Sequence, residues 1–348
     1  AIDPLLCYFS SKGGAMAYVT IRDVAQRSGT SVSTVSRALN NRGRISRETK
    51  ALVEKTAHEL GYIPDSRAQA MRSTRTRLVG LLVPDIRNPY FADLAYAIQD
   101  TLFDAGYCTS IGTSSEDSVK QDAYIMNMLS QHIDGAIIVP RGGKSKALKA
   151  LVDISVPMVF VDRHVNDMPE VPVVDSDPSE GLLKALTDLH SRGFRKVGYI
   201  SGPIVDSPTL QEREYAFRSA GRALFGEDNL FVESTSFGHV SCLSMIRKMR
   251  GSGVNAFIFG YSQDAVQAIS ALGYQGLAIG KDISLISFDD LEMFRLMTPN
   301  ISVISQQVHV IGSLGAQLFL DIVERGRKAG AQRVETVYIP RGSVGEAR

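Results

Sequence analysis

The sequence has no run of eighteen apolar residues, and its amino-terminal residues lack the basic-then-apolar pattern of a secretion signal. Neither a membrane-spanning helix nor export is indicated, so we expect a cytoplasmic, nucleoid-associated protein with no membrane partner. Cysteine is scarce, because the chain contains only Cys7, Cys108 and Cys242. An odd number of distant cysteines argues against a disulfide framework and against a metal site. We therefore expect neither a metal ion nor a cofactor.

The familiar catalytic motifs are also missing. The sequence has no HExxH, GxSxG or paired CxxC motif, and its six histidines are scattered. The stretch VPRGGKSK, residues 139–146, ends like a phosphate-binding loop, but the first glycine of that motif is replaced by Ile138. These absences indicate that the protein is not an enzyme.

The charge is unevenly distributed along the chain. Residues 19–77 hold 12 Lys and Arg against 5 Asp and Glu, a local balance of +7. Because the whole chain carries +1 and residues 1–18 are neutral, the remainder carries −6. A small basic segment beside a larger acidic one favours a polyanionic partner for the basic part, with a merely solvated basic surface as the alternative.

The 348 residues are enough for two or three domains. Residues 1–18 show no periodicity, and we expect a disordered extension or a vector-derived segment. Residues 19–61 predict three short helices, with a cap at Thr20, a stop at Gly29 and a new start at Ser46. Residues 62–77 form a basic connector, and a different pattern begins at residue 78.

Residues 78–348 alternate short apolar runs with helical stretches. The runs are LVGLLVP, DGAIIVP, PMVFVD, KVGYISGP, AFIFGY and ISLISFDD. Such runs predict parallel strands covered on both faces, and their alternation with helices predicts βαβ units. We expect two doubly wound lobes, with lobe 1 at about 78–162 and 290–322 and lobe 2 at about 163–289 and 323–348.

The stretch SGTSVSTVSRALN, residues 28–40, predicts a helix with one bare face. Val35, Ala38 and Leu39 gather on one side, whereas Ser33, Ser36 and Arg37 lie opposite. Short hydroxyl side chains let a helix approach the floor of a DNA major groove, where one arginine can bond guanine. Together with the preceding helix this predicts a helix-turn-helix, although a serine-capped surface helix has the same pattern.

The motifs TIRDVA, GTSVSTVSRALN, ISRET and ELGYIP resemble the headpiece of the LacI/GalR (lactose-repressor) family, and the resemblance extends over about residues 19–343. It implies a DNA-binding transcriptional repressor that binds double-stranded DNA, a pseudo-palindromic operator, as a homodimer. By this resemblance Val32, Ser33 and Arg37 read bases. The positions expected to contact phosphates are Thr20, Ser31, Thr34 and Ser36.

The connector PDSRAQAMRS is too short to be helical alone in water, so we expect it to fold only on DNA. In the family this segment enters the minor groove as a pair of helices. The resemblance places Ala68 in that contact and makes Met71 the apolar wedge between base pairs. A flexible linker is the alternative.

The resemblance also implies a periplasmic-binding-protein-like effector domain with an α/β fold. Polar and aromatic residues follow the predicted strands, where open α/β sheets bind ligands. Taken together they resemble the pocket of pentose binders, ribose binders especially, although Gln263 stands where those relatives usually have asparagine. The expected effector-binding residues are Asn88, Tyr90, Phe91, Asp162, Arg163, Arg213, Phe237, Gln263, Asp264, Asp289 and Gln306.

Several alternatives remain open at this point. The effector could be a nucleoside, a hexose or a sugar phosphate, and it could release DNA or act as a co-repressor. A sugar-transport receptor would share the cavity but not the basic head. A sugar-modifying enzyme would need a reactive acid, base or nucleophile, whereas Asp162, Asp264 and Asp289 are better explained as acceptors for sugar hydroxyls.

Overall fold

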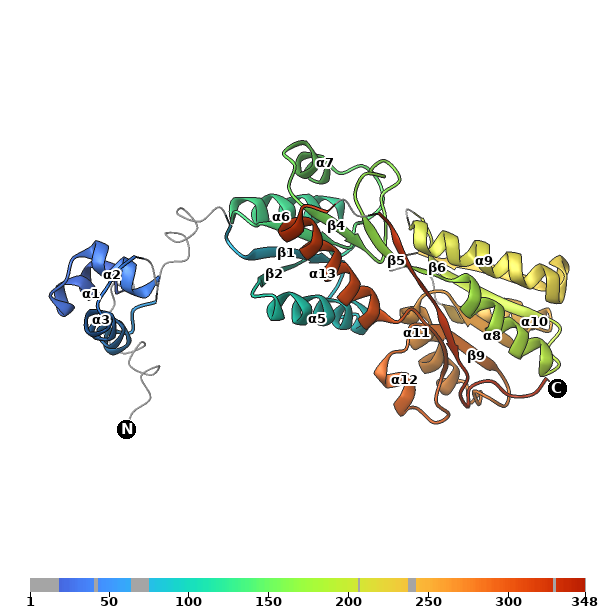
Figure 1. Cartoon of the computed structure of the whole chain (residues 1–348). Helices are drawn as coiled ribbons and strands as arrows, with labels where there is room; N and C mark the ends of the chain where they lie inside the picture. Colours follow the sequence, from blue (N-terminus) through green and yellow to red (C-terminus); the bar gives the residue numbers. More distant parts are fainter. Residues whose placement is uncertain are drawn as a thin grey trace. The chain divides into compact units, whose positions relative to one another are not determined.

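The computed structural model describes residues 19–40, 43–63, 75–205, 207–236, 242–327 and 330–347. The chain divides into two compact units, Ala1–Thr76 and Arg77–Arg348 (Figure 1). The division lies one residue before the start that the sequence predicts for the larger domain. No helix in the described part of the chain is long and apolar enough to cross a membrane.

The described part of the smaller unit contains three helices, α1 Ile21–Ser28, α2 Val32–Leu39 and α3 Arg47–Leu60. Gly29 and Gly61 end α1 and α3 in the left-handed conformation, with φ of 63° and 64°, which glycine adopts without steric cost. One apolar side chain from each helix is fully buried where the three meet: Val24, Val35 and Val53. This small core fixes α1 and α2 as the helix-turn-helix that the sequence predicts.

Among the described residues of the larger unit, the strands form two six-stranded sheets, ordered β11-β5-β4-β3-β1-β2 and β12-β10-β9-β8-β6-β7. The elements of lobe 1 are β1 Leu78–Val83, α5 Pro89–Asp104, β2 Cys108–Thr113, α6 Ser118–Ser130, β3 Gly135–Ile138, α7 Lys146–Asp153, β4 Met158–Val161, β5 Val173–Asp177, α13 Val308–Arg325 and β11 Gln332–Glu335. Those of lobe 2 are α8 Ser179–Ser191, β6 Val197–Pro203, α9 Pro208–Phe225, a 3-10 turn Glu227–Asn229, β7 Leu230–Thr235, α10 Cys242–Gly251, β8 Ala256–Phe259, α11 Ser262–Tyr274, β9 Ser284–Phe288, α12 Glu292–Leu296, β10 Ser302–Ser305 and β12 Val337–Ile339.

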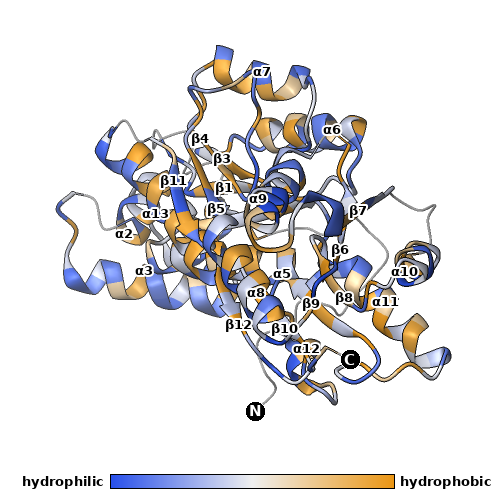
Figure 2. Ribbon diagram, turned by 90° about the vertical axis from the view of Figure 1, so that its right-hand side faces the viewer, coloured by the Kyte–Doolittle hydropathy of each residue, from blue (hydrophilic) through white to orange (hydrophobic). Residues whose placement is uncertain are grey.

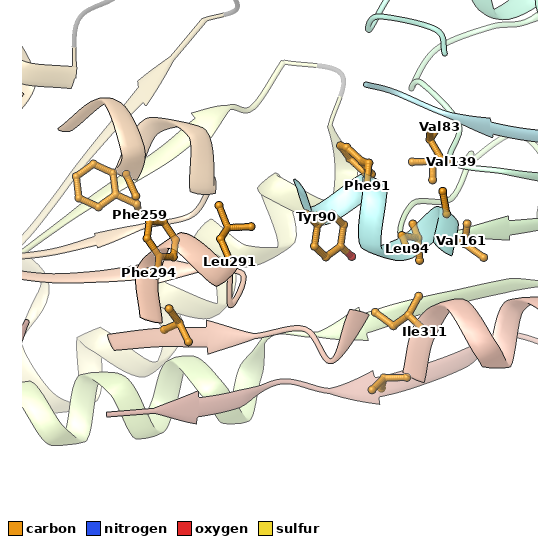
Figure 3. Packing of buried hydrophobic residues seen from close by; sticks show 14 of the residues in the cluster. Val83, Tyr90, Phe91, Leu94, Val139, Val161, Phe259, Leu291, Phe294 and Ile311 are labelled. Carbon is orange, nitrogen blue, oxygen red and sulfur yellow. The ribbon is translucent and has the colours of Figure 1, made fainter. Parts of the chain in front are cut away.

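Alternate residues of each central strand enter different cores. In β1, Leu81 and Val83 pack with α5 and α13, whereas Leu82 between them packs with α6 and α7. The central strands are therefore buried along nearly their whole length, while the edge strand β11 is mostly hydrophilic (Figure 2). Burial on both faces is what the continuous apolar runs predict. Figure 3 shows the core that contains Leu81 and Val83 from close by. Val83, Val139, Val161, Leu94 and Ile311 lie at its lobe 1 end, and Phe259, Leu291 and Phe294 lie at its lobe 2 end.

The chain crosses between the lobes three times, after β5, after β10 and after β11. These crossings correct the predicted lobe boundaries, since β5 and β11 belong to the lobe 1 sheet and residues 290–305 belong with lobe 2. The sequence did not reveal β2, β5, β7, β10 or β11; VVDSD of β5 and QRVE of β11, for example, are short and carry charged residues. Thr336 ties two crossings together, because its backbone N–H and its hydroxyl both donate to the carbonyl of Asp177.

Candidate DNA-binding surface and interlobe cavity

The exposed face of α2 carries the residues that the sequence assigns to DNA reading. Val35 and Ala38 are buried against α1 and α3, whereas Ser33 and Arg37 are exposed and the side chain of Val32 is 41% exposed. Ser31 caps the helix, and its hydroxyl oxygen accepts a hydrogen bond from the backbone N–H of Thr34 at 3.1 Å. The helix therefore presents small side chains and one guanidinium, which suits close approach to a groove.

The residues expected to contact phosphates lie at helix starts or on the same helix. Thr20 precedes α1, and its backbone N–H and hydroxyl both donate to the Asp23 carboxylate at 2.7 Å. The hydroxyl oxygen of Ser31 lies 2.8 Å from that of Thr34, and Ser36 is half-buried on α2. Hydroxyls at helix N-termini are well placed to bond phosphate oxygens. The two connector positions, Ala68 and Met71, lie outside the described residues.

In the larger unit a cavity opens between the lobes at the carboxyl ends of the parallel strands, the edge at which open α/β sheets bind ligands. It encloses about 330 Å³ of empty space, including the part open to solvent at its mouth. We call it the interlobe cavity. Its lining residues are Asn88, Tyr90, Phe91, Asp162, Arg163, Ser207, Thr209, Leu210, Arg213, Tyr261, Asp289 and Gln306.

The two sheets place one aspartate each at equivalent points. Asp162 directly follows β4 and Asp289 directly follows β9, and these strands hold the same position in their respective sheets. Both residues adopt the left-handed conformation with φ of 65°, an uncommon backbone state for a non-glycine residue. Such conformations concentrate at ligand sites, because the surrounding structure must hold them in place.

The lobe 1 side of the cavity is built from α5 and the end of β4. Asn88 caps α5 by accepting from the backbone N–H of Tyr90 at 3.1 Å. The hydroxyl of Tyr90 donates to the Asp162 carboxylate at 2.6 Å. Burial, followed by the nearby charges of Asp162 and Asp289, raises the pKa of Tyr90 well above its usual value, so this hydroxyl remains a donor. Figure 3 shows Tyr90 and Phe91 at the start of α5.

Lobe 2 supplies Asp289, which is 4% exposed and held from two sides. Its carboxylate accepts from the Ser262 hydroxyl at 2.8 Å and from the Gln306 amide at 2.6 Å. Gln306 lies in a crossing between the lobes, and its carbonyl oxygen accepts from Ser176 of β5 at 2.7 Å. Burial raises the pKa of Asp289, while the charge of Arg213 opposes that shift. These two hydrogen bonds fix the orientation of the carboxylate.

Arg213 of α9 is the second fixed group from lobe 2, and it is 4% exposed. Its guanidinium lies 4.3 Å from the centre of the Phe288 ring and donates to the carbonyl of Gly260 at 2.7 Å. Its Nε is buried without a hydrogen-bond partner. A buried guanidinium with an unmet donor can bond a ligand oxygen.

Eight of the eleven expected effector residues line the interlobe cavity, and Phe237 lies outside the described residues. Gln263 and Asp264 are not among the lining residues, which corrects the expectation. Asp264 instead bonds inside lobe 2, where Thr235 donates to it at 2.7 Å and Cys242 is a second partner. Tyr261, three residues before Asp264, lines the cavity.

Four lining residues were missed: Ser207, Thr209, Leu210 and Tyr261. Ser207, Thr209 and Leu210 surround the start of α9, and the sequence signal for them is the SPT that follows the strand KVGYISGP. Tyr261 follows β8 in the same way. Within the described part of the chain, no group of three or more His, Cys, Asp or Glu residues could hold a metal ion.

Comparisons with known proteins find matches in both units. The family model for bacterial regulatory proteins of the lacI family matches residues 20–65, and the family model for the periplasmic binding protein-like domain matches residues 186–344. The ribose operon repressor of Bacillus subtilis is 31% identical over 311 residues, covering 88% of this chain and 92% of the relative. That of Halalkalibacterium halodurans is 28% identical over 308 residues, covering 88% and 91%.

Solved structures share the fold. A Lac repressor dimer bound to operator and an anti-inducer has a TM-score of 0.80 at 22% identity, covering 94% of this chain and 99% of that one. A LacI family transcriptional regulator from Enterococcus faecium with bound ribose has a TM-score of 0.69 at 23% identity, covering 78% and 100%.

A helix-turn-helix unit joined to a two-lobed domain with a polar cavity defines a DNA-binding transcriptional regulator controlled by a small molecule. The chain belongs to the lacI family of bacterial regulatory proteins. The named relatives and structures of this family are transcriptional repressors and regulators.

Proposed function

We propose that this regulator represses transcription in the cytoplasm by binding a pseudo-palindromic operator as a homodimer, and that its effector is ribose or another pentose. The observation that carries the effector assignment is the pair of equivalent aspartates, Asp162 and Asp289, facing one cavity with the buried Arg213. Carboxylates and a guanidinium bond the adjacent hydroxyls of a sugar, and Phe91 supplies an aromatic face for its C–H groups. The names of two relatives, both ribose operon repressors, support the same choice.

On DNA, each headpiece would place α2 in a major groove. Val32, Ser33 and Arg37 would contact base edges, whereas Thr20, Ser31, Thr34 and Ser36 would hold phosphates. Ala68 and Met71 of the connector would enter the minor groove at the centre of the operator and bend it. Two headpieces on one dimer explain a pseudo-palindromic site.

Effector binding would favour one arrangement of the lobes, because the cavity is lined from both lobes and from a crossing between them. A different arrangement changes the spacing of the two connectors and so the fraction of dimers able to hold DNA. Couplings of this kind are about 1–3 kcal/mol. Either sign is compatible with this geometry, so the sugar acts as an inducer or as a co-repressor.

A thermal-shift screen of the full chain against pentoses, hexoses, nucleosides and sugar phosphates tests the effector assignment. A ligand of the cavity raises the unfolding temperature by mass action, so we expect D-ribose or another pentose to give the largest rise. Asp289→Asn should abolish most of that rise, whereas Glu180→Gln should keep it, because Glu180 pairs with Lys184 on the surface of α8.

Two results would contradict the assignment. One is a larger shift with a nucleoside or a hexose than with any pentose. The other is chemical turnover of a pentose by the purified protein, since the carboxylates of the cavity would then act on the sugar rather than hold it.

A further inference from the structure

The charged groups that line the interlobe cavity and the carboxylate behind them do not cancel. Two carboxylates, Asp162 and Asp289, and two guanidinium groups, Arg163 and Arg213, line it. A third carboxylate, Glu116, lies directly behind Arg163 in the loop that leads from β2 to α6. Among the described lining residues there is no lysine and no histidine. The charge that a ligand meets therefore depends on how Arg163 is paired.

Glu116 forms a bidentate ion pair with Arg163 through both carboxylate oxygens. The two terminal nitrogens of the guanidinium donate to the two carboxylate oxygens at 3.0 and 2.9 Å. Both side chains are largely buried, 11% exposed for Arg163 and 17% for Glu116, and a paired, bidentate geometry is what makes a buried ion pair tolerable. Glu116 adopts a left-handed backbone with φ of 56° to reach this position, and this strain persists because the surrounding structure holds it.

The remaining contacts of Arg163 also oppose an anionic ligand. Its Nε lies 3.5 Å from the Asp162 carboxylate, and its guanidinium lies 5.5 Å from the centre of the Phe91 ring. The charge and the hydrogen bonds of Glu116 raise the pKa of Arg163 against the opposing effect of burial, so the guanidinium stays charged. A guanidinium has five N–H donors, so donors remain for neutral hydroxyls, while its charge is already balanced.

The sum over these five described groups leaves no positive charge unbalanced. With every group ionised, three carboxylates and two guanidinium groups give −1, and protonation of the buried Asp289 would bring the sum only to zero. A phosphate or carboxylate brought into this space would face repulsion that no spare positive charge offsets. A neutral polyhydroxylated molecule meets donors and acceptors without that cost.

We infer that Glu116, through its ion pair with Arg163, makes the interlobe cavity selective for uncharged polyhydroxylated effectors and against their phosphorylated counterparts. This inference rests on the proposed sugar-binding function and narrows it. It makes Glu116 a positioning residue that sets the charge of the site without itself lining the cavity.

The test compares D-ribose with D-ribose 5-phosphate by isothermal titration calorimetry, using the full chain at one ionic strength and pH. We expect the unmodified protein to bind ribose at least ~10-fold more tightly than the phosphate. In Glu116→Gln the freed Arg163 should attract the phosphate, and the ratio of the two affinities should fall by at least ~10-fold.

Three further variants separate charge from fold. Glu116→Asp keeps the carboxylate and should retain most of the discrimination, whereas Glu116→Ala removes the carboxylate and replaces the glutamine variant as the test if that variant fails to fold. Glu180→Gln removes an exposed ion pair on α8 and should leave the ratio unchanged. A general loss of structure would weaken both ligands together and would not move the ratio.

An unmodified protein that prefers ribose 5-phosphate would overturn the inference and leave a sugar-controlled regulator standing. An unchanged ratio in a folded Glu116→Gln variant would overturn it as well. Failure of both sugars to bind, in a protein that still binds operator DNA, would contradict the pentose assignment and remove the inference with it.

Discussion

Asp264 matches a ligand-binding pattern in the sequence, but the hydrogen bonds of its side chain lie within lobe 2. It lies in the first turn of α11, and its carboxylate points to Thr235 and Cys242. Burial raises its pKa, and burial together with the nearby Asp264 carboxylate raises the pKa of the Cys242 thiol to about 12. The Cys242 thiol therefore stays protonated, and the Asp264 carboxyl group keeps its proton to a higher pH than an exposed aspartate does.

Substitution of Asp264 by asparagine should stabilise the protein at pH values above the raised pKa of its carboxyl group. A carboxyl whose folded-state pKa is raised contributes most below its unfolded-state pKa, and that contribution is lost as pH rises through the folded-state pKa. A neutral amide side chain at this position avoids the loss. We expect Asp264→Asn to raise Tm by ~2–4 °C at pH 8 and by less at pH 4, measured by circular dichroism.

The exposed Asp228→Asn serves as the matched control and should change Tm little at either pH. A fall in the Tm of Asp264→Asn at pH 8 would show that the charged carboxylate is the stabilising form.

We propose that Arg37 reads bases directly. It is exposed on the face of α2 opposite Val35 and Ala38. We expect Arg37→Ala to lose about 1–3 kcal/mol of discrimination at one position of each half-site while the salt dependence of binding stays nearly intact. Fluorescence anisotropy with single-base operator variants measures both. Equal weakening on every sequence would show that Arg37 contacts phosphate instead. Lys55→Ala on the exposed face of α3 is a suitable control.

The sequence predicts most single residues of the cavity because they follow strand ends, where apolar runs stop at a polar residue. It fails at Gln263 and Asp264 because α11 begins at Ser262, and the turn of the helix directs Asp264 into lobe 2 while Tyr261 lines the cavity. Glu116 was missed because it lies 47 residues from Arg163 in the chain. Only the path of the loop after β2 brings the two together.

At the scale of elements, α13 and α5 pack at very close range. A methyl group added to Gly312 would lie 2.7 Å from Cβ of Ala97 and 3.1 Å from the backbone oxygen of Leu94. The two helices come this close because α13 has glycine where they cross. The same helix has Gly315 against Val161 of β4, so α13 approaches both its neighbouring helix and the sheet.

Gly312→Ala should therefore destabilise the larger unit by about 1–3 kcal/mol, although alanine favours a helix over glycine by about 1 kcal/mol. Urea unfolding measures the change. The control is Gly273→Ala on α11, where nothing lies within 4 Å of the added carbon, and the same propensity should make it neutral or stabilising. Equal effects of the two substitutions would contradict the close packing of α13.

The sequence predicts apolar central strands better than it predicts short polar strands. Six central strands, β1, β3, β4, β6, β8 and β9, are buried on both faces and stand out as apolar runs, so the sequence predicts these strands but not their order in the sheets. The strands β5 and β11 lie at the crossing side of the lobe 1 sheet, where polar residues serve the contacts between lobes. Short polar strands have no alternation strong enough to distinguish them from loops.

At the scale of the whole effector domain, one ion-pair network joins the lobes. Arg333 of β11 donates to Asp175 of β5 at 3.0 Å within lobe 1, and to both carboxylate oxygens of Glu212 on α9 of lobe 2 at 2.8 and 3.0 Å. Glu212 precedes the cavity residue Arg213. A change in lobe arrangement must therefore strain or break this tie.

Arg333→Gln should weaken sugar binding by about two- to fivefold, or about 0.5–1 kcal/mol, which is the range for a partly exposed ion pair. Calorimetric titration of the sugar that emerges from the thermal-shift screen measures this. Arg218→Gln is the control, because its pair with Glu214 lies within α9 alone. Equal losses of sugar affinity in the two variants would mean that the ion pair between the lobes does not affect effector binding.

Sugar-controlled, sequence-specific DNA binding is tested most directly by measuring how tightly the full chain holds one DNA duplex, selected from a random pool, relative to a scrambled duplex, with and without D-ribose. We predict at least ~10³-fold tighter binding of the selected duplex and a roughly five- to 150-fold change in that affinity on adding the sugar, about 1–3 kcal/mol. A protein that binds no duplex better than scrambled DNA, whether or not a sugar is present, would contradict it.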